Sequence, residues 1–463
     1  MYNDIQMKNL TQGDIRKQLT AFAIPMLIGT LFQQINSLAD TIIVGRFIDG
    51  NSVAAVGISL GVSMFLIASV TGLTTGSSIV ISQYYGAKQY DKLKLAVSTS
   101  VIFLTVLSLI ITLLGVLFTA EILQILNAPE NIFADAHSYM QIIMAGIIFT
   151  VFYNLYTAYL RALGDAKTPL YTLIISSVLN IIVNIILVVI FGYGLRVTAA
   201  TTVGAKALAT LLCFIYVRYR QPLLRIKKLA FNKEMLKIIL KYGIPAAIQL
   251  SIVTLAGLTV ARLVNSFGSA AAAGITLAGK IDQIALMPII TISAALATFV
   301  AQNMGADQDE RAVEGFKIAT TQMFILAVII SICLFLITPI LFRLFIYSGD
   351  PNVVEINFVG QSYLRIMVIF YFLFAFLFGF NGFFRGAGDA VIAMAFPIIS
   401  LAIRVASAYA LVYWANMGPE ALAWSIPIGW SLSSILSYIY YKKGLWKGKI
   451  VTNINKEKVA VNN

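Results

Sequence analysis

Residues 159–166 read YLRALGDA, and residues 383–390 read FFRGAGDA. The two stretches keep an arginine and a glycine–aspartate pair at matching positions, 224 residues apart. Other similar stretches occur in the same order in the two halves of the chain, at offsets of 217 to 224 residues, and they pair Pro25 with Pro245, Gly57 with Gly274, Gln83 with Gln302 and Tyr139 with Tyr363. Matches in constant order indicate a duplicated unit of about 220 residues.

The composition places this duplicated unit in a membrane. Of 463 residues, 59% are hydrophobic and 11% are charged, whereas soluble domains carry about 25% charged residues. The mean hydropathy is +0.87, and the apolar residues fall in runs that reach the roughly 20 residues a bilayer requires. These figures exclude a water-soluble, a disordered and a disulfide-stapled chain. The predicted spans are 19–45, 52–84, 95–118, 138–161, 169–191, 198–217, 242–266, 270–303, 319–345, 357–384, 390–415 and 421–441.

We therefore predict an all-α integral membrane protein with twelve transmembrane helices in two six-helix bundles. Because each repeat has an even number of spans, both keep one orientation, and their pseudo-two-fold axis runs along the membrane normal. Two such bundles leave a central cleft, as in an alternating-access transporter. The predicted parts are an N-terminal lobe (1–217), a cytoplasmic linker (218–241), a C-terminal lobe (242–445) and a cytoplasmic tail (446–463).

The net charge of +13 follows from this topology. Most of the lysines and arginines fall in loops on one side of the predicted spans, and the other side has little beyond Arg46, Arg196 and Arg343. By the positive-inside rule, both termini and the linker are cytoplasmic. We expect a multi-pass, monomeric protein of the bacterial cytoplasmic membrane that contacts the bilayer and binds no nucleic acid.

The chain has few residues of the types that act in enzyme active sites. Cys213 and Cys333 lie in separate apolar runs, and His137 is the only histidine. One histidine without partners makes neither a metal centre nor a catalytic triad, and no motif for nucleotide binding or hydrolysis appears. We expect no catalytic residues, no resident metal and no organic cofactor.

The repeated Q-x-x-G-A after the second span of each half and the repeated R-x-x-G-D before the fifth resemble the multidrug and toxic compound extrusion (MATE) family. So does Pro25, followed fifteen residues later by the intramembrane Asp40 and then by V-G. The resemblance covers essentially the whole chain. It implies export of bulky, often cationic organic compounds, driven by protons or sodium, from two lobes that form a V-shaped cleft.

Polar side chains form stripes on two spans of the N-terminal half. Gln33, Asn36 and Asp40 are spaced i, i+3, i+7 on the first span, and the fifth span has the same spacing in Ser177, Asn180 and Asn184. If the two stripes face each other, they form a polar pocket around Asp40. Ionisable groups in a bilayer are costly and mark functional sites, so we expect Asp40 to exchange a proton there. The sixth span offers Thr201 and Thr202 as a further hydroxyl, of which Thr202 is our choice, and carries Lys206, which either counters Asp40 or reaches a polar interior.

The MATE resemblance assigns the coupling acid to Asp40. It is closer to the DinF-like pattern, whose fifth span pairs an asparagine with an acid four residues later. Here Asn180 matches and Asn184 replaces the acid. The acids that the NorM-like branch has in its seventh and tenth spans are absent, and the seventh has Gln249 instead. A proton is therefore the expected coupling ion, although Asp40, Asn180 and Asn184 also offer oxygen ligands to Na⁺.

The eighth span carries a second polar cluster. Lys280, Gln283 and Met287 share a face, whereas Asp282 points about 200° away from Lys280. We expect Gln33, Asn36, Gln249, Lys280, Gln283 and Met287 to line the substrate cleft. Asp282 and Arg404 are expected to be charged supporting residues inside the membrane, and Arg404, the repeat-equivalent of Asn180, is one candidate partner for Asp282, in a structural pair.

The predicted function is a proton-coupled antiporter that exports amphipathic cationic compounds, such as drugs and toxins, by alternating access. One alternative is a Na⁺-coupled exporter of the same fold. Another is a lipid-linked oligosaccharide flippase, for which Lys206, Lys280 and Arg404 would bind pyrophosphate.

Overall fold

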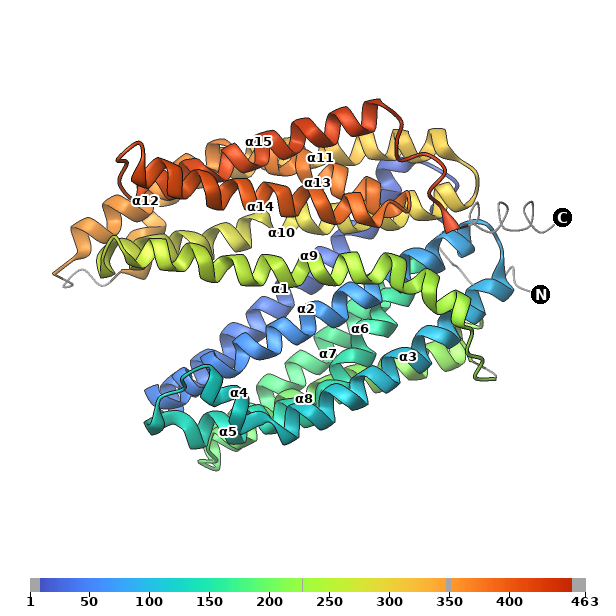
Figure 1. The fold of residues 1–463 in the computed structure, drawn as a ribbon. Helices are drawn as coiled ribbons and strands as arrows, with labels where there is room; N and C mark the ends of the chain where they lie inside the picture. Colours follow the sequence, from blue (N-terminus) through green and yellow to red (C-terminus); the bar gives the residue numbers. More distant parts are fainter. Residues whose placement is uncertain (1–8, 227, 347–350, 452–463) are drawn as a thin grey trace. The chain divides into compact units, whose positions relative to one another are not determined.

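The structure is a computed structural model that describes residues 9–226, 228–346 and 351–451, and all the regular elements in these ranges are helices (Figure 1). The chain divides into two compact units. One is Met1–Leu10 with Ala21–Ala247, and the other is Thr11–Thr20 with Ile248–Asn463. The predicted tail beyond residue 451 lies outside the described residues.

The helices of the N-terminal half run from α1 to α8, and the fifth span ends in a π-helix, η1. Their bounds are α1 Ile15–Phe47, α2 Gly50–Gly86, α3 Tyr90–Leu117, α4 Thr119–Ile125, α5 Glu130–Ala145, α6 Ile147–Ala162, α7 Lys167–Asn184, η1 Ile185–Ile190 and α8 Leu195–Arg220.

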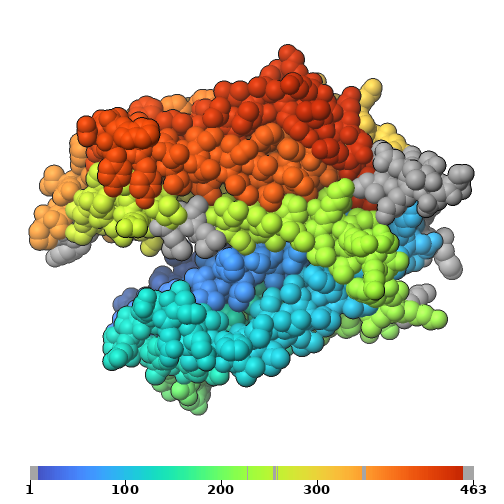
Figure 2. Space-filling model, viewed as in Figure 1, coloured from blue at the N-terminus to red at the C-terminus, as the bar shows by residue number. Residues whose placement is uncertain are grey.

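The C-terminal half repeats this order, and its described residues show no counterpart of α4 or of η1. Its helices are α9 Lys233–Asn265, α10 Ser269–Gly305, α11 Asp309–Phe345, α12 Val353–Ile369, α13 Tyr371–Gly386, α14 Ala390–Tyr413 and α15 Glu420–Lys442. Within the second unit, α14 and α15 pack along their lengths, and Figure 2 shows their side chains as a continuous orange and red surface.

The prediction of an all-α protein with twelve spans is confirmed. In the part of the chain that the structure describes, ten helices are long and apolar enough to cross a membrane, and the number is twelve when each of two bent pairs is taken as one span. The pairs are α5 with α6, bent by 45°, and α12 with α13, bent by 53°. They are the fourth span of each repeat, so the bend is part of the duplicated unit.

Both of these spans were predicted as continuous helices, which was wrong. The first bend lies at Gly146, where an added Cβ would come 2.3 Å from a methyl group of Val203 on α8. Close approach of another helix thus requires glycine at the break. The second bend lies at Phe370, which has no such glycine and gives no sequence signal.

The repeated R-x-x-G-D motif is explained by local structure. Gly164 and Gly388 end α6 and α13 with φ of +85° and +89°, a conformation that favours glycine. Asp165 then caps α7, accepting hydrogen bonds from the backbone N–H groups of Lys167 at 3.1 Å and Thr168 at 3.0 Å. The motif therefore turns the chain between spans in each half.

Small residues bring helices close within the first unit. A Cβ on Gly72 of α2 would lie 2.2 Å from the backbone of Ala247 on α9, and one on Gly76 would lie 2.3 Å from Gly243. Glycines four residues apart allow such backbone contact between membrane helices, where van der Waals packing drives association. This contact fixes the start of α9 against α2.

Candidate functional site

Asp40 lies in a hydrogen-bonded cluster inside the first unit, between α1, α7 and α8. Asn184 Nδ2 donates to Asp40 Oδ1 at 2.8 Å. Asn36 Nδ2 lies 3.4 Å from Asp40 Oδ2 and 3.3 Å from Asn180 Oδ1. Thr201 Oγ1 donates to Asn184 Oδ1. The predicted stripes on the first and fifth spans do face each other in the structure.

Among the described residues, the groups nearest to the Asp40 carboxyl group are amides and not cations. Asp40 is half-buried, and no described lysine or arginine lies within ion-pair distance of it. Lys206 and Tyr139 act on it only at longer range. The Lys206 ammonium lies instead 5.0 Å from the ring centroid of Tyr153, a cation–π contact. The carboxyl group is therefore held by amides rather than neutralised by a cation.

Two polar atoms of the cluster are buried without a hydrogen-bond partner in the described structure: Asn36 Oδ1 and Asn180 Nδ2. One is an acceptor and the other a donor. An unpaired buried polar atom costs about 1–3 kcal/mol. The cluster therefore has unused hydrogen-bonding capacity beside the carboxyl group.

Asn184 is the last residue of α7, and the π-helix η1 begins immediately after it. Phe191 N donates to Ile186 O, the five-residue spacing of a π-turn. Such turns are rare and often lie at functional sites. No feature of the sequence predicted this change of helix type next to a site residue.

The predicted role of Thr202 in this pocket needs correction. Its hydroxyl donates to Thr198 O of its own helix at 2.8 Å, whereas Thr201 contacts Asn184. Neighbouring residues on a helix point about 100° apart. The rotation of α8 therefore brings Thr201 to the cluster.

The candidate pair of Asp282 and Arg404 does not form a direct ion pair among the described residues. Tyr371 Oη donates to Asp282 Oδ1 at 2.8 Å. Arg404 is near enough to act electrostatically on Asp282 and Tyr363, but no ion pair forms between the two charges among the described residues. Tyr371 begins α13 directly after the 53° bend, and this places its hydroxyl at the carboxylate.

The residues predicted to line a cleft have different environments. Gln33, Lys280 and Gln283 are exposed, and Asn36 belongs to the Asp40 cluster. Met287 and Gln249 are only 9% and 5% exposed, so both side chains are buried.

Arg385 is a polar residue of the second unit that the sequence analysis did not assign to a site. Arg385 Nη2 donates to Asn381 Oδ1 at 2.7 Å and to Gln249 Oε1 at 3.3 Å. Gln249 therefore holds a buried guanidinium in place. The recurrence of arginine in the R-x-x-G-D motif was the signal that pointed to it.

The amides that contact the Asp40 carboxyl group present nitrogen to it and not oxygen. Asn184 presents its amide nitrogen to Asp40, and the oxygens of Asn184 and Asn180 accept from Thr201 and Asn36. Sodium binds oxygen ligands, so both amides would have to turn over. Among the described residues, no group of three or more His, Cys, Asp or Glu side chains is placed to hold a metal ion.

Comparison with known families gives a match over most of the chain. The family model described as MatE matches residues 25–186 and 245–410, one segment in each half. Both segments follow the repeat read from the sequence.

Curated relatives match along nearly their full length. The Probable multidrug resistance protein YoeA of Bacillus subtilis (strain 168) is 28% identical, with 96% of this chain and 97% of the relative covered. The Multidrug export protein MepA of Staphylococcus aureus (strain MSSA476) is 26% identical, with 94% and 95% covered. These relatives are named for multidrug resistance and multidrug export, in agreement with the prediction that the chain is not an enzyme.

A solved structure has the same fold. The outward-facing conformation of a multidrug resistance MATE family transporter of the MOP superfamily superimposes with a TM-score of 0.88 at 24% identity. The match covers 95% of this chain and 97% of that one.

Proposed function

The chain belongs to the multidrug and toxic compound extrusion (MATE) family of membrane transporters, and from this we propose that it is a proton-coupled antiporter that exports amphipathic organic cations. The observation that carries the proposal is the hydrogen bond from the Asn184 amide to Asp40, a carboxyl group without a paired cation. The relatives named for multidrug resistance and multidrug export support the substrate class.

Protonation of Asp40 is the step that links the ion to the conformation. An ionised carboxylate accepts from both Asn184 and Asn36, as observed. A protonated carboxyl group has one O–H donor, which would face an amide N–H, also a donor. The amides or their helices must then rearrange, so the two protonation states favour different packings of α1 against α7.

An unpaired atom beside Asp40 can accept a hydrogen bond from the protonated carboxyl group. Asn36 Oδ1 is a buried acceptor without a partner. It can accept the new O–H after a rotation of the amide. The unpaired atom raises the free energy of the deprotonated state, and the new hydrogen bond removes this penalty in the protonated state.

The proton gradient supplies enough free energy for export. One elementary charge moving through roughly 150 mV yields about 3.5 kcal/mol. For a monovalent cation exchanged for one proton, this offsets the few-hundred-fold accumulation of the cation in the cell that the same potential would drive.

Proton coupling is favoured over sodium coupling by the direction of the amides. In the observed arrangement the amides of Asn184 and Asn36 present N–H groups to Asp40, so neither contact supplies an oxygen ligand for a cation. A sodium site at Asp40, Asn180 and Asn184 would lose these hydrogen bonds before gaining oxygen ligands.

We further propose a monomer in the bacterial cytoplasmic membrane with both termini inside. The proposed lobes are residues 1–217 and 242–445, joined by a cytoplasmic linker. The lysine-rich and arginine-rich loops support this orientation.

The coupling ion is tested with purified protein in liposomes that contain no other ion pump. Efflux of a fluorescent organic cation is followed under a proton gradient alone and under a sodium gradient alone. The proposal expects transport with the first and none with the second. Transport driven only by sodium would overturn proton coupling, and transport of anionic lipid-linked sugars instead of the dye would favour the flippase.

A further inference from the structure

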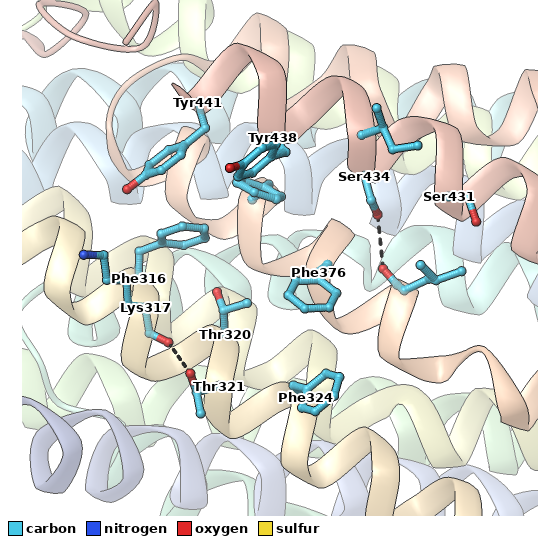
Figure 3. Close-up of a pocket in the computed structure, with 13 residues that line it drawn as sticks. Phe316, Lys317, Thr320, Thr321, Phe324, Phe376, Ser431, Ser434, Tyr438 and Tyr441 are labelled. Atoms are coloured by element: carbon cyan, nitrogen blue, oxygen red, sulfur yellow. Dashed lines mark hydrogen bonds between the residues drawn. The ribbon is translucent and has the colours of Figure 1, made fainter. Parts of the chain in front are cut away.

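A cavity of about 700 Å³ lies within the second unit between α11, α13 and α15 (Figure 3). Its volume is that of a site for a drug-sized or lipid-sized molecule. None of the residues proposed for ion coupling lines it, so it is a separate feature of the chain.

The walls of the cavity are aromatic and are held in place by their neighbours. Six rings line it, those of Phe316, Phe324, Phe376, Phe380, Tyr438 and Tyr441. The Phe316 ring centroid lies 5.1 Å from that of Phe380 and 5.1 Å from that of Tyr441, and the centroids of Phe324 and Phe376 are 5.7 Å apart. Rings in mutual contact form a preformed apolar surface.

The polarity of the cavity changes along the helices. Lys317 and Tyr441 lie where α11 begins and α15 ends, and Figure 3 shows both at one end of the cavity, with Phe324 toward the other. At 1.5 Å per residue, the stretch from Ser431 to Tyr441 spans about 15 Å. The cavity is therefore a groove with one polar end and an apolar length that matches part of an acyl chain.

The hydroxyl groups along the groove differ in what they offer a ligand. Thr321 Oγ1 donates to Lys317 O, and Ser434 Oγ donates to Leu373 O, so these two are already used by the backbone. Thr320 is 7% exposed, and its Oγ1 is buried without a hydrogen-bond partner in the described structure. It lies about one helical turn from Lys317 on α11.

The charge of the residues that line the groove disfavours an organic cation as its ligand. Lys317 is the one charged residue among those that line the groove, and no carboxylate is among them. Lys442 and Lys443 extend the positive charge at the same end of α15. Aromatic rings alone attract cations, but here a lysine occupies the polar end.

We propose that this groove binds an anionic glycerophospholipid, with its phosphate at Lys317 and one acyl chain between the aromatic rings. In the proposed orientation the lipid comes from the cytoplasmic leaflet, whose anionic headgroups are attracted to basic residues near the surface. The site is independent of proton coupling at Asp40.

The test counts lipid retained by the full-length protein in native mass spectrometry. The probes are phosphatidylglycerol and phosphatidylcholine with identical acyl chains. We expect the wild type to retain phosphatidylglycerol preferentially. Lys317→Gln should retain about fivefold less of it, the effect of one lysine near a headgroup, whereas Lys317→Arg should retain it as the wild type does.

Two further variants make the result specific to the groove. Lys442→Gln removes an exposed lysine at the same end that does not line the groove, and it should retain phosphatidylglycerol normally. Thr321→Trp fills the groove while leaving Lys317 in place, and it should lose both lipids. Dye efflux by each variant under a proton gradient reports whether it is folded.

Three results would overturn the proposal. Equal losses in Lys317→Gln and Lys442→Gln would show a diffuse charge effect. Displacement of the lipid by an equal concentration of glycerol 1-phosphate would show that the acyl chain does not bind. Displacement by tetraphenylphosphonium would show that the groove takes organic cations.

Discussion

The amide nitrogen of Asn184 lies 2.8 Å from a carboxylate oxygen of Asp40, although 144 residues separate the two in the chain. The contact joins α1 to the last residue of α7, immediately before a π-helix. In the proposed mechanism, this contact links the protonation state of one carboxyl group to the packing of two helices.

The neighbouring threonines of α8 should differ in their effect on transport. Thr201→Val removes the hydroxyl that donates to Asn184, so the amide that holds Asp40 loses its orientation. A lost buried hydrogen bond of this kind costs about 1–3 kcal/mol, and proton-driven dye efflux should fall about tenfold or more. Thr202→Val removes a hydroxyl bonded only to its own helix and serves as the matched control. Equal efflux by the two variants would contradict the assignment of Thr201.

The sequence predicted the two stripes of this site but not which threonine joins them. Spacing of i, i+3, i+7 places Asn36 and Asp40 on one face of a helix, and burial of polar groups in lipid requires that face to meet another polar face. The choice between Thr201 and Thr202 depends on the rotation of α8, which the packing of all its neighbours sets.

Removal of the Tyr371 hydroxyl should destabilise the second unit. Tyr371→Phe leaves the Asp282 carboxylate without its donor at 2.8 Å. The expected loss in the free energy of unfolding is about 1–3 kcal/mol, measured as a lower thermal unfolding midpoint in detergent. Tyr193→Phe, at a side chain that is 53% exposed, should leave the midpoint unchanged. A wild-type midpoint for Tyr371→Phe would mean that Arg404 compensates for the lost bond.

The candidate Asp282–Arg404 pair shows a limit of reasoning from repeats. The repeat correctly placed Arg404 near Asp282. However, a tyrosine carried in by an unpredicted bend became the hydrogen-bond donor. The bend at Phe370 has neither proline nor glycine at the break, so the sequence could not reveal it.

The contact between α2 and α9 in the first unit should not tolerate a side chain at Gly76. Gly76→Leu places atoms where the backbone of Gly243 lies, 2.3 Å from the new Cβ. Because backbone cannot move aside as a side chain can, the variant should lose about 3 kcal/mol or more of stability. Gly61→Leu on the same helix meets nothing within 4 Å and is the control. Similar yields and midpoints for both variants would argue against close packing of α2 on α9.

The chain after α15 should stabilise the second unit in a pH-dependent way. Lys449 Nζ lies 2.8 Å from Asp389, a residue with 4% exposure. Burial opposes the charge of Lys449, but hydrogen bonds to Asp389 and Tyr440 outweigh it, so the pKa of Lys449 lies above its ordinary value of 10.5. The stabilisation is therefore complete below 10.5 and is lost as pH rises through the raised pKa.

Thermal unfolding from neutral pH to about pH 11 measures this contribution. Lys449→Met should lower the free energy of unfolding at neutral pH by about 1 kcal/mol, because the lysine side chain is 42% exposed, and it should lower the midpoint accordingly. Its difference from the wild type should shrink at high pH. Lys443→Met removes an exposed lysine nearby and should show neither effect. A difference that stays constant with pH would mean that packing, not charge, is what the substitution disturbs.

The role of Asp40 is tested most directly by proton-driven efflux of a cationic dye from liposomes that contain either the wild type or Asp40→Asn. Asp135→Asn, at an exposed acid, is the control. The account predicts that Asp40→Asn binds the dye and unfolds at a normal temperature but no longer responds to the proton gradient, whereas the control exports normally. Undiminished gradient-driven export by Asp40→Asn would contradict it.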